Sequence, residues 1–233
     1  LFTATSLFYF GSFLFIFLIR VQEPRVAVQE DHSGWKDIRQ GLSYAAKHPI
    51  LLPLFILTVA DNLLIMGPAT VGTPIFVKQE LQGSATAYAT TEVSYAVGML
   101  TGTGLMLYFG KRFKRGKLLL WGMFFDGVTF IPIYFIDSLL ALQITFVVHS
   151  IAIPFLIVPR AAIIQTIVPE NMTGRIFALI NLAVVGVTAI SAGVTGIAVE
   201  SFGVRVVFAA IGIGGGICGV IGLWFARQLR ETA

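Results

Sequence analysis

Residues 139–160 have the sequence LLALQITFVVHSIAIPFLIVPR, in which the only Asp, Glu, Lys or Arg is Arg160 at the end. About 20 apolar residues in an α-helix, at 1.5 Å per residue, cross the hydrocarbon core of a bilayer, which is about 30 Å thick. The stretch does not alternate polar and apolar residues, as a strand of a membrane β-barrel would. It therefore predicts a membrane-spanning helix.

Six more apolar runs of similar length occur in the rest of the chain. They lie near residues 1–19, 50–77, 84–109, 118–136, 176–199 and 204–226. The 233-residue chain is 56% hydrophobic and only 12% charged, whereas a soluble domain has about 25% charged residues. Soluble enzymes, nucleic-acid-binding proteins and secreted disulfide scaffolds are therefore poor fits, and the single Cys218 cannot form an internal disulfide. The predicted fold class is an all-α, polytopic membrane protein.

The basic residues predict how the chain is oriented in the membrane. If the seven runs are spans, every Lys and Arg except Lys78 and Arg205 lies on the same side. Because short cytoplasmic loops are enriched in Lys and Arg, residue 1 is predicted outside and the C-terminus in the cytoplasm. The membrane would be a cell membrane, either inner or plasma. The net charge of +4 is spread over helix ends, so we predict no nucleic-acid partner.

A polar segment, residues 20–49, separates the first run from the second. Apolar residues recur in it at helical spacing, with charged residues between them: Trp35, Ile38, Leu42 and Ala45. This part predicts an amphipathic helix that lies in the inner membrane interface. The dipeptide His48-Pro49 marks the start of the next span.

Three stretches give the arrangement a family resemblance: the lead-in from Trp35 to Pro49, GKRFKRGK at 110–117 and VPENMTGRIF at 168–177. With six spans after a long inner linker, the chain resembles the second half of a major facilitator superfamily transporter. The Pro-x-x-x-x-Gly-Arg pattern in the last stretch is most similar to the exporter branch of macrolide-efflux proteins and the enterobactin exporter. That branch is also described as drug–proton antiporters or transmembrane secretion effectors.

The resemblance implies three parts of the chain. Residues 1–19 would be the last helix of a missing N-terminal half, 20–49 a cytoplasmic linker with the interfacial helix, and 50–233 a C-terminal six-helix transmembrane domain. The first run starts at Leu1 without a Met, a charged n-region or a cleavage site, so it is not a signal peptide. We expect a fragment of a longer protein, and a complete seven-span protein is the alternative.

The basic turn at 110–117 departs from the family pattern, which usually has an Asp beside its basic residues. The resemblance implies loop or gating roles for basic residues of the inner connections, namely Lys111, Arg112, Arg115, Arg160 and Arg175. Because the Asp is missing, the alternative is that these residues only anchor the inner interface.

Four ionisable residues are predicted deep within spans, where a charge costs at least about 2.5–3.5 kcal/mol: Asp61, Glu92, Asp126 and His149. In the fold that the chain resembles, the seventh, eighth, tenth and eleventh helices face the central cavity. This implies proton coupling for Asp61, Glu92 and His149, and a structural role for Asp126 on the peripheral ninth helix. Burial favours the protonated carboxylic acid, so its proton can be exchanged near neutral pH. The alternative is a side chain hydrogen-bonded to neighbouring helices or, for Glu92, a side chain that snorkels outward to the interface.

Helix breaks are predicted at Gly67-Pro68 and at Pro154 and Pro159, because proline removes a backbone hydrogen-bond donor from a helix. Broken helices mark substrate sites in many transporters. The alternative is the ordinary tolerance of membrane helices for proline. Glycine pairs such as Gly98/Gly102 predict close helix contacts. Candidate residues for a substrate cavity are Asn62, Tyr88, Tyr95, Phe155 and Gln165.

The leading functional hypothesis is a proton-coupled secondary exporter of amphipathic small molecules, such as drugs, macrolides or siderophore-like compounds, that works by alternating access. The alternatives are a same-fold importer or lysophospholipid flippase and, from another class, a seven-helix receptor-like membrane protein. No span contains paired metal-ligand His, a Gly-x-Ser-x-Gly elbow or a P-loop. We therefore predict no enzyme, no metal and no cofactor. The expected partners are the lipid bilayer, the substrate, protons and the missing N-terminal half.

Overall fold

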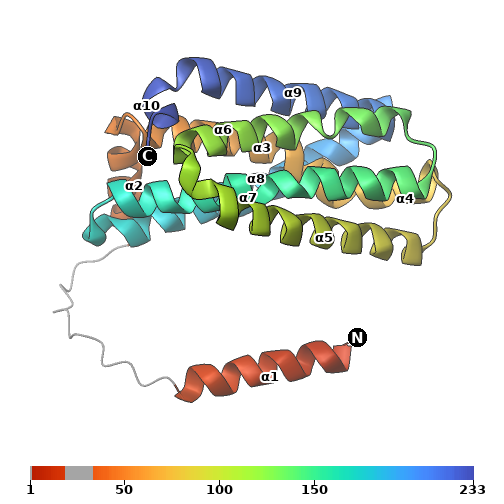
Figure 1. Cartoon of the computed structure of the whole chain (residues 1–233), viewed down its shortest axis with the longest axis horizontal. Coiled ribbons are helices and arrows are strands. Elements are labelled where there is room, and N and C mark those ends of the chain that lie inside the picture. The colour runs from red at the N-terminus through yellow and green to blue at the C-terminus, as the bar shows by residue number, and fades with distance from the viewer. Residues whose placement is uncertain (1, 19–33) are drawn as a thin grey trace. The chain divides into compact units, whose positions relative to one another are not determined.

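The computed structural model describes residues 2–18 and 34–233, and these residues form helices with no β-strand among them (Figure 1). The all-α fold class is confirmed. In chain order the elements are α1 (Phe2–Leu18), α2 (Gly34–Lys47), α3 (Leu51–Gly67), the π-helical turn η1 (Pro68–Gly72), α4 (Thr73–Gln79), α5 (Ala85–Phe109), η2 (Gly110–Arg112), α6 (Arg115–Val128), η3 (Ile131–Phe135), α7 (Leu139–Ile167), α8 (Glu170–Phe202), α9 (Val204–Phe225) and α10 (Arg227–Arg230).

The chain divides into two units, Leu1–Gly34 and Trp35–Ala233. Within the first unit, α1 is an apolar helix of 17 residues. The second unit has six helices that are long and apolar enough to cross a membrane. They correspond to six of the seven predicted runs, and α1 is the shorter seventh. Of the predicted linker 20–49, residues 20–33 lie outside the described part of the chain.

Short polar residues define where several spans begin. Ser84 accepts a hydrogen bond from the Ala87 amide and thus caps α5, and Ser138 does the same for α7 through Ala141. His48 Nδ1 accepts hydrogen bonds from the amides of Ile50 and Leu51, at 3.2 and 3.4 Å, so it caps α3. His48-Pro49 therefore marks the start of this span, as predicted.

The connection between α7 and α8 is much shorter than predicted. The end of the apolar run placed a connection between Arg160 and Arg175, but α7 continues to Ile167 and α8 begins at Glu170. Both arginines consequently lie inside helices. The prediction was wrong because the apolar runs were taken to end at charged residues, whereas both helices continue through them.

The prolines have different effects on α3 and α7. At Gly67-Pro68 the α-helix ends and the π-helical turn η1 follows before α4. By contrast, α7 is continuous over Pro154 and Pro159, so the break predicted there does not interrupt the helix. A proline removes one backbone donor, and other groups of a membrane bundle can satisfy the freed carbonyl.

The bundle contacts leave two spans largely uncovered. In the second unit α5 packs on α7, α6 on α7 and α9, and α3 on α8 and α9. Only 11% of the apolar window of α5 and 22% of that of α8 are buried, against 39–50% for the other four spans. These two helices therefore present wide faces that this unit does not cover.

Candidate functional site

Five polar side chains from three spans lie inside the bundle, and we call them the polar cluster: Asp61 and Asn62 of α3, Asp126 of α6 with Thr129 at its C-terminal cap, and His149 of α7. Apart from the half-buried Thr129, all are at most 5% exposed. Buried polar groups need partners because water is not available to replace them. The contacts within the polar cluster therefore decide its chemistry.

The polar cluster lies between two apolar cores. On α3, Asp61 is flanked by Leu57 of one core and Ile65 of the other. On α6, Asp126 has the same position between Met123 and Phe130. These apolar layers separate the cluster from both ends of the bundle, so a charge within it is poorly screened.

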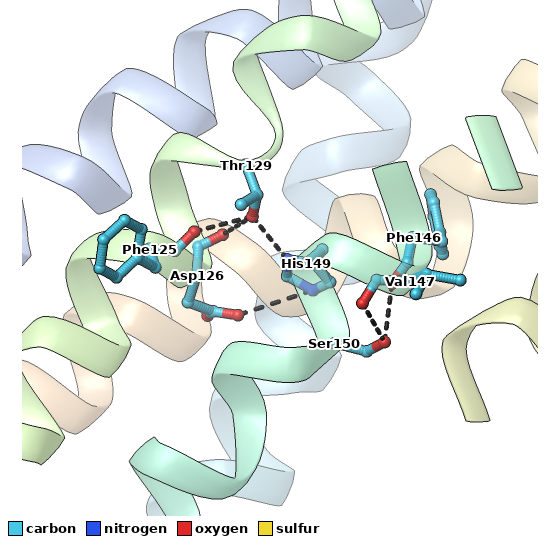
Figure 2. Close-up of polar contacts among 7 residues, drawn as sticks. All are labelled: Phe125, Asp126, Thr129, Phe146, Val147, His149 and Ser150. Atoms are coloured by element: carbon cyan, nitrogen blue, oxygen red, sulfur yellow. Dashed lines mark hydrogen bonds and ion pairs between the residues drawn. The ribbon is translucent and has the colours of Figure 1, made fainter. Parts of the chain in front are cut away.

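His149 and Asp126 form the centre of the polar cluster. His149 Nε2 lies 3.6 Å from Asp126 Oδ1, and these two side chains are 4% and 2% exposed. Figure 2 shows the carboxylate directed at the ring from the neighbouring helix. The ring of Phe130 packs on the imidazole with centroids 4.3 Å apart, and the ring of Tyr95 lies at 6.2 Å. The pair is therefore enclosed by aromatic rings.

Thr129 determines which nitrogen of His149 carries the proton. Its hydroxyl lies 2.7 Å from the Phe125 carbonyl one turn earlier, and 2.9 Å from His149 Nδ1 (Figure 2). Because a hydroxyl has one hydrogen and the carbonyl can only accept, we assign that hydrogen to the carbonyl. Nδ1–H then donates to Thr129, which leaves Nε2 as the acceptor that faces Asp126. In the neutral state the Asp126–His149 pair thus carries one exchangeable proton, on Oδ1 or on Nε2, although the two atoms, 3.6 Å apart, are not hydrogen-bonded in this structure.

Asp61 is the second buried carboxylate of the polar cluster. Its Oδ1 has no hydrogen-bond partner among the residues that the structure describes, while the neighbouring Asn62 donates to the Thr58 carbonyl at 2.8 Å. Asp61 interacts electrostatically with Arg160 of α7 and with Asp126. Arg160, predicted as a loop residue, therefore lies partially buried inside α7, within electrostatic range of this carboxylate.

The other predicted site residues lie apart from the polar cluster. Glu92 is exposed on α5 and forms a side-chain hydrogen bond with Tyr88. Phe155 lines an apolar groove on the outside of α6 and α7, and Gln165 is exposed near the end of α7. Of the five predicted cavity residues, only Asn62 and Tyr95 lie at the cluster.

Sequence reasoning missed the contact of His149 with Asp126 and did not select Thr129. Asp126 was predicted to be structural because of its peripheral helix, yet its side chain points at His149 (Figure 2). A signal was present, since residues three apart on a helix share a face. The spacing of Asp126 and Thr129 could have identified this polar face.

The predicted inner-side residues form separate contacts. Lys111 and Arg112 are exposed on η2, and Arg115 donates to Thr166 Oγ1 at 2.7 Å. Arg175 pairs with Asp37 of α2 at 2.8 Å and donates to Gln40 Oε1 at 3.1 Å. The amphipathic helix α2 is thus attached to α8 through its polar side.

The apolar residues of α2 are partly buried against α8 and partly exposed. Gly41 and Ala45 are buried, with Gly41 against Leu179 of α8. Trp35 is 79% exposed and Leu42 57% exposed. This exposed apolar side is the one expected to face the membrane interface.

At the opposite end of the bundle, Arg205 joins three segments. Its guanidinium contacts Glu80 at 2.6 Å, Asp137 at 2.8 Å and the Tyr134 carbonyl at 2.9 Å. No group of three potential metal ligands occurs among residues 2–18 and 34–233. The polar cluster, with the buried ionisable side chains of Asp61, Asp126 and His149, is the candidate site.

The comparisons agree with this architecture. The sequence profile of the Major Facilitator Superfamily matches residues 54–233, which include nearly all of the six spans. A search of curated proteins found no match. Members of this superfamily are secondary transporters and not enzymes, so the receptor-like alternative is dropped. Because the match covers well over half of its length, the chain belongs to the Major Facilitator Superfamily and is a multi-pass membrane protein of the transporter class.

Proposed function

We propose that this chain is part of a proton-coupled exporter of amphipathic small molecules, such as drugs, macrolides or siderophore-like compounds. The observation that carries the proposal is the Asp126–His149 pair, which is buried between two apolar cores with Nε2 and Oδ1 3.6 Å apart. Such a pair can hold one proton and stay neutral overall, whereas release of that proton leaves a buried Asp126 carboxylate.

Proton binding would change the contact between two packed helices. With one exchangeable proton the pair is neutral overall, and with a second proton it becomes a charged His149 beside a neutral Asp126. The two states differ by one charge on the pair. This charge acts on Asp61, which interacts electrostatically with both Asp126 and Arg160. A change of this kind can shift the balance between inward- and outward-facing states, provided that protons bind the two states differently.

The substrate pathway would lie where α5 and α8 are uncovered. We propose that another six-helix half packs against these faces. Glu92 and Tyr88 on α5 would then line the shared cavity. The end of the bundle with Lys111 and Arg112 would face the cytoplasm of a cell membrane, with residue 1 outside.

Proton coupling can be tested in proteoliposomes that contain the purified protein and the trapped pH dye pyranine. We expect ethidium or erythromycin to release protons from acidic vesicles, because each substrate molecule would exchange for protons. Nigericin, which collapses the pH gradient, should remove substrate accumulation. Accumulation that persists with nigericin, or that follows a sodium gradient, would contradict proton coupling.

A second candidate function is the flipping of lysophospholipids. It is favoured by the apolar groove of about 310 Å³ between α6 and α7, whose wall includes Trp121, Phe125 and Thr129. The groove reaches the residue that hydrogen-bonds to His149. Movement of fluorescent lysophosphatidylethanolamine, but not of ethidium, in the same vesicles would favour this function over drug export.

A further inference from the structure

A cavity of about 610 Å³ lies at the basic end of the bundle. Its walls come from the end of α5, from η2, from the start of α6, from the second half of α7 and from Ala233. Met106, Leu107, Val158 and Pro159 form an apolar wall, while Lys111 and Arg112 form part of a basic rim. A cavity with one apolar wall and one basic rim matches an amphiphile that has a negative headgroup.

Two of the basic residues at the cavity already have partners. Lys114 pairs with Glu231, and the hydrogen bonds from Lys114 and Arg230 lower the pKa of the Glu231 carboxyl. Arg115 donates to Thr166 of α7. These contacts join α6 to α7 and to the C-terminal segment, so they hold the rim of the cavity in place.

Lys111 and Arg112 have no acidic partner within the described residues. Arg112 is held by aromatic rings instead, with its guanidinium carbon 5.3 Å from the ring centre of Tyr108 and 5.5 Å from that of Phe109. A guanidinium fixed in this way keeps its donors available for an oxyanion. The basic turn at 110–117 lacks the Asp that the family pattern usually has there. In the part of the chain that the structure describes, Lys111 and Arg112 are therefore left without a neutralising carboxylate at this rim.

The start of α6 adds a third element to the rim. This helix has 14 residues, and its N-cap residue Lys114 makes no side-chain capping bond. The N-terminus of a helix carries a partial positive charge and favours an anion. It lies beside the same rim, because Lys114 and Arg115 line the cavity.

We propose that this cavity binds one anionic phospholipid of the surrounding leaflet. The phosphate would contact Lys111, Arg112 and the start of α6, and one acyl chain would lie along Met106, Leu107 and Val158. The exposed apolar side chains Leu107 and Val158, at 75% and 45%, continue this path onto the surface of the helices. The site is independent of proton coupling and would exist whatever the transporter carries.

The test compares lipid binding to the purified protein by native mass spectrometry. We expect phosphatidylglycerol to bind more tightly than phosphatidylcholine, and the Lys111→Gln/Arg112→Gln variant to bind phosphatidylglycerol about 30-fold more weakly. Lys117→Gln/Arg227→Gln removes the same charge from exposed residues at the same end, outside the cavity lining. This control should retain the preference for phosphatidylglycerol.

Three results would overturn the proposal. Equal loss in the control variant would mean general attraction by net charge. Unchanged binding in Lys111→Gln/Arg112→Gln would mean that another surface holds the lipid. Displacement of the lipid by inorganic phosphate would mean that the site binds a free anion. If the site binds a lipid, Val158→Trp should weaken lipid binding, because the larger side chain would fill the space along the apolar wall.

Discussion

Asp126→Asn is expected to abolish proton-driven transport while the protein still folds and inserts into the membrane. Asparagine has the same shape but cannot exchange a proton, so the pair would lose the proton that Asp126 carries and only His149 could still bind one. His149 Nε2 would still have a neighbour at this position, which limits the structural damage. Loss of a proton-transfer group costs about 10²–10⁴-fold in rate, and we expect coupled transport to fall at least 100-fold.

The double variant Asp126→Asn/His149→Gln tests whether the two residues share one proton or contribute independently to transport. If the pair acts as one unit, the double variant should be no slower than either single variant. Glu200→Gln is the matched control, because it removes a carboxylate from an exposed position at the end of α8. Substrate-induced proton release in pyranine-loaded vesicles is the measurement. Additive losses, or equal loss in Glu200→Gln, would contradict the shared-proton interpretation.

The sequence could predict which helices exist, because apolar length is a local property. Six spans lie where the apolar runs are, and the serine caps of α5 and α7 are visible as Ser84 and Ser138. It could not predict the ends of α7 and α8, since both helices continue through Arg160 and Arg175, the charged residues at which the connection was placed. Because of that error Arg160 was assigned to a loop, whereas it lies inside α7, within electrostatic range of Asp61.

The candidate site could be predicted only in part, because a pair between helices depends on how the helices rotate about their axes. Burial cost identified Asp61 and His149 correctly as deep residues. It placed Glu92 with them, although Glu92 is exposed on α5. The helix order of the family made Asp126 peripheral, but a peripheral helix still has one face directed inward.

Gly98→Ala and Gly102→Ala should strongly destabilise the contact between α5 and α7. A methyl group at residue 98 would overlap the Val147 carbonyl and the Ser150 hydroxyl, and at residue 102 it would overlap the Ile151 carbonyl. Backbone atoms cannot move aside as flexible side chains do, so the two helices would have to separate. Overpacking costs about 1–3 kcal/mol and occasionally more, and we expect values at or above the upper end.

Gly104→Ala provides the matched control on the same helix, because no described atom lies within 4 Å of the added methyl group. Alanine favours a helix over glycine by about 0.5–1 kcal/mol, so this variant should be as stable as the parent or slightly more stable. Thermal unfolding followed by size-exclusion chromatography in detergent measures the difference. The displaced Ser150 adjoins His149, so Gly98→Ala should also impair proton release in whatever protein remains folded. Equal melting temperatures for Gly98→Ala and Gly104→Ala would mean that α5 does not pack on α7 as closely as these contacts require.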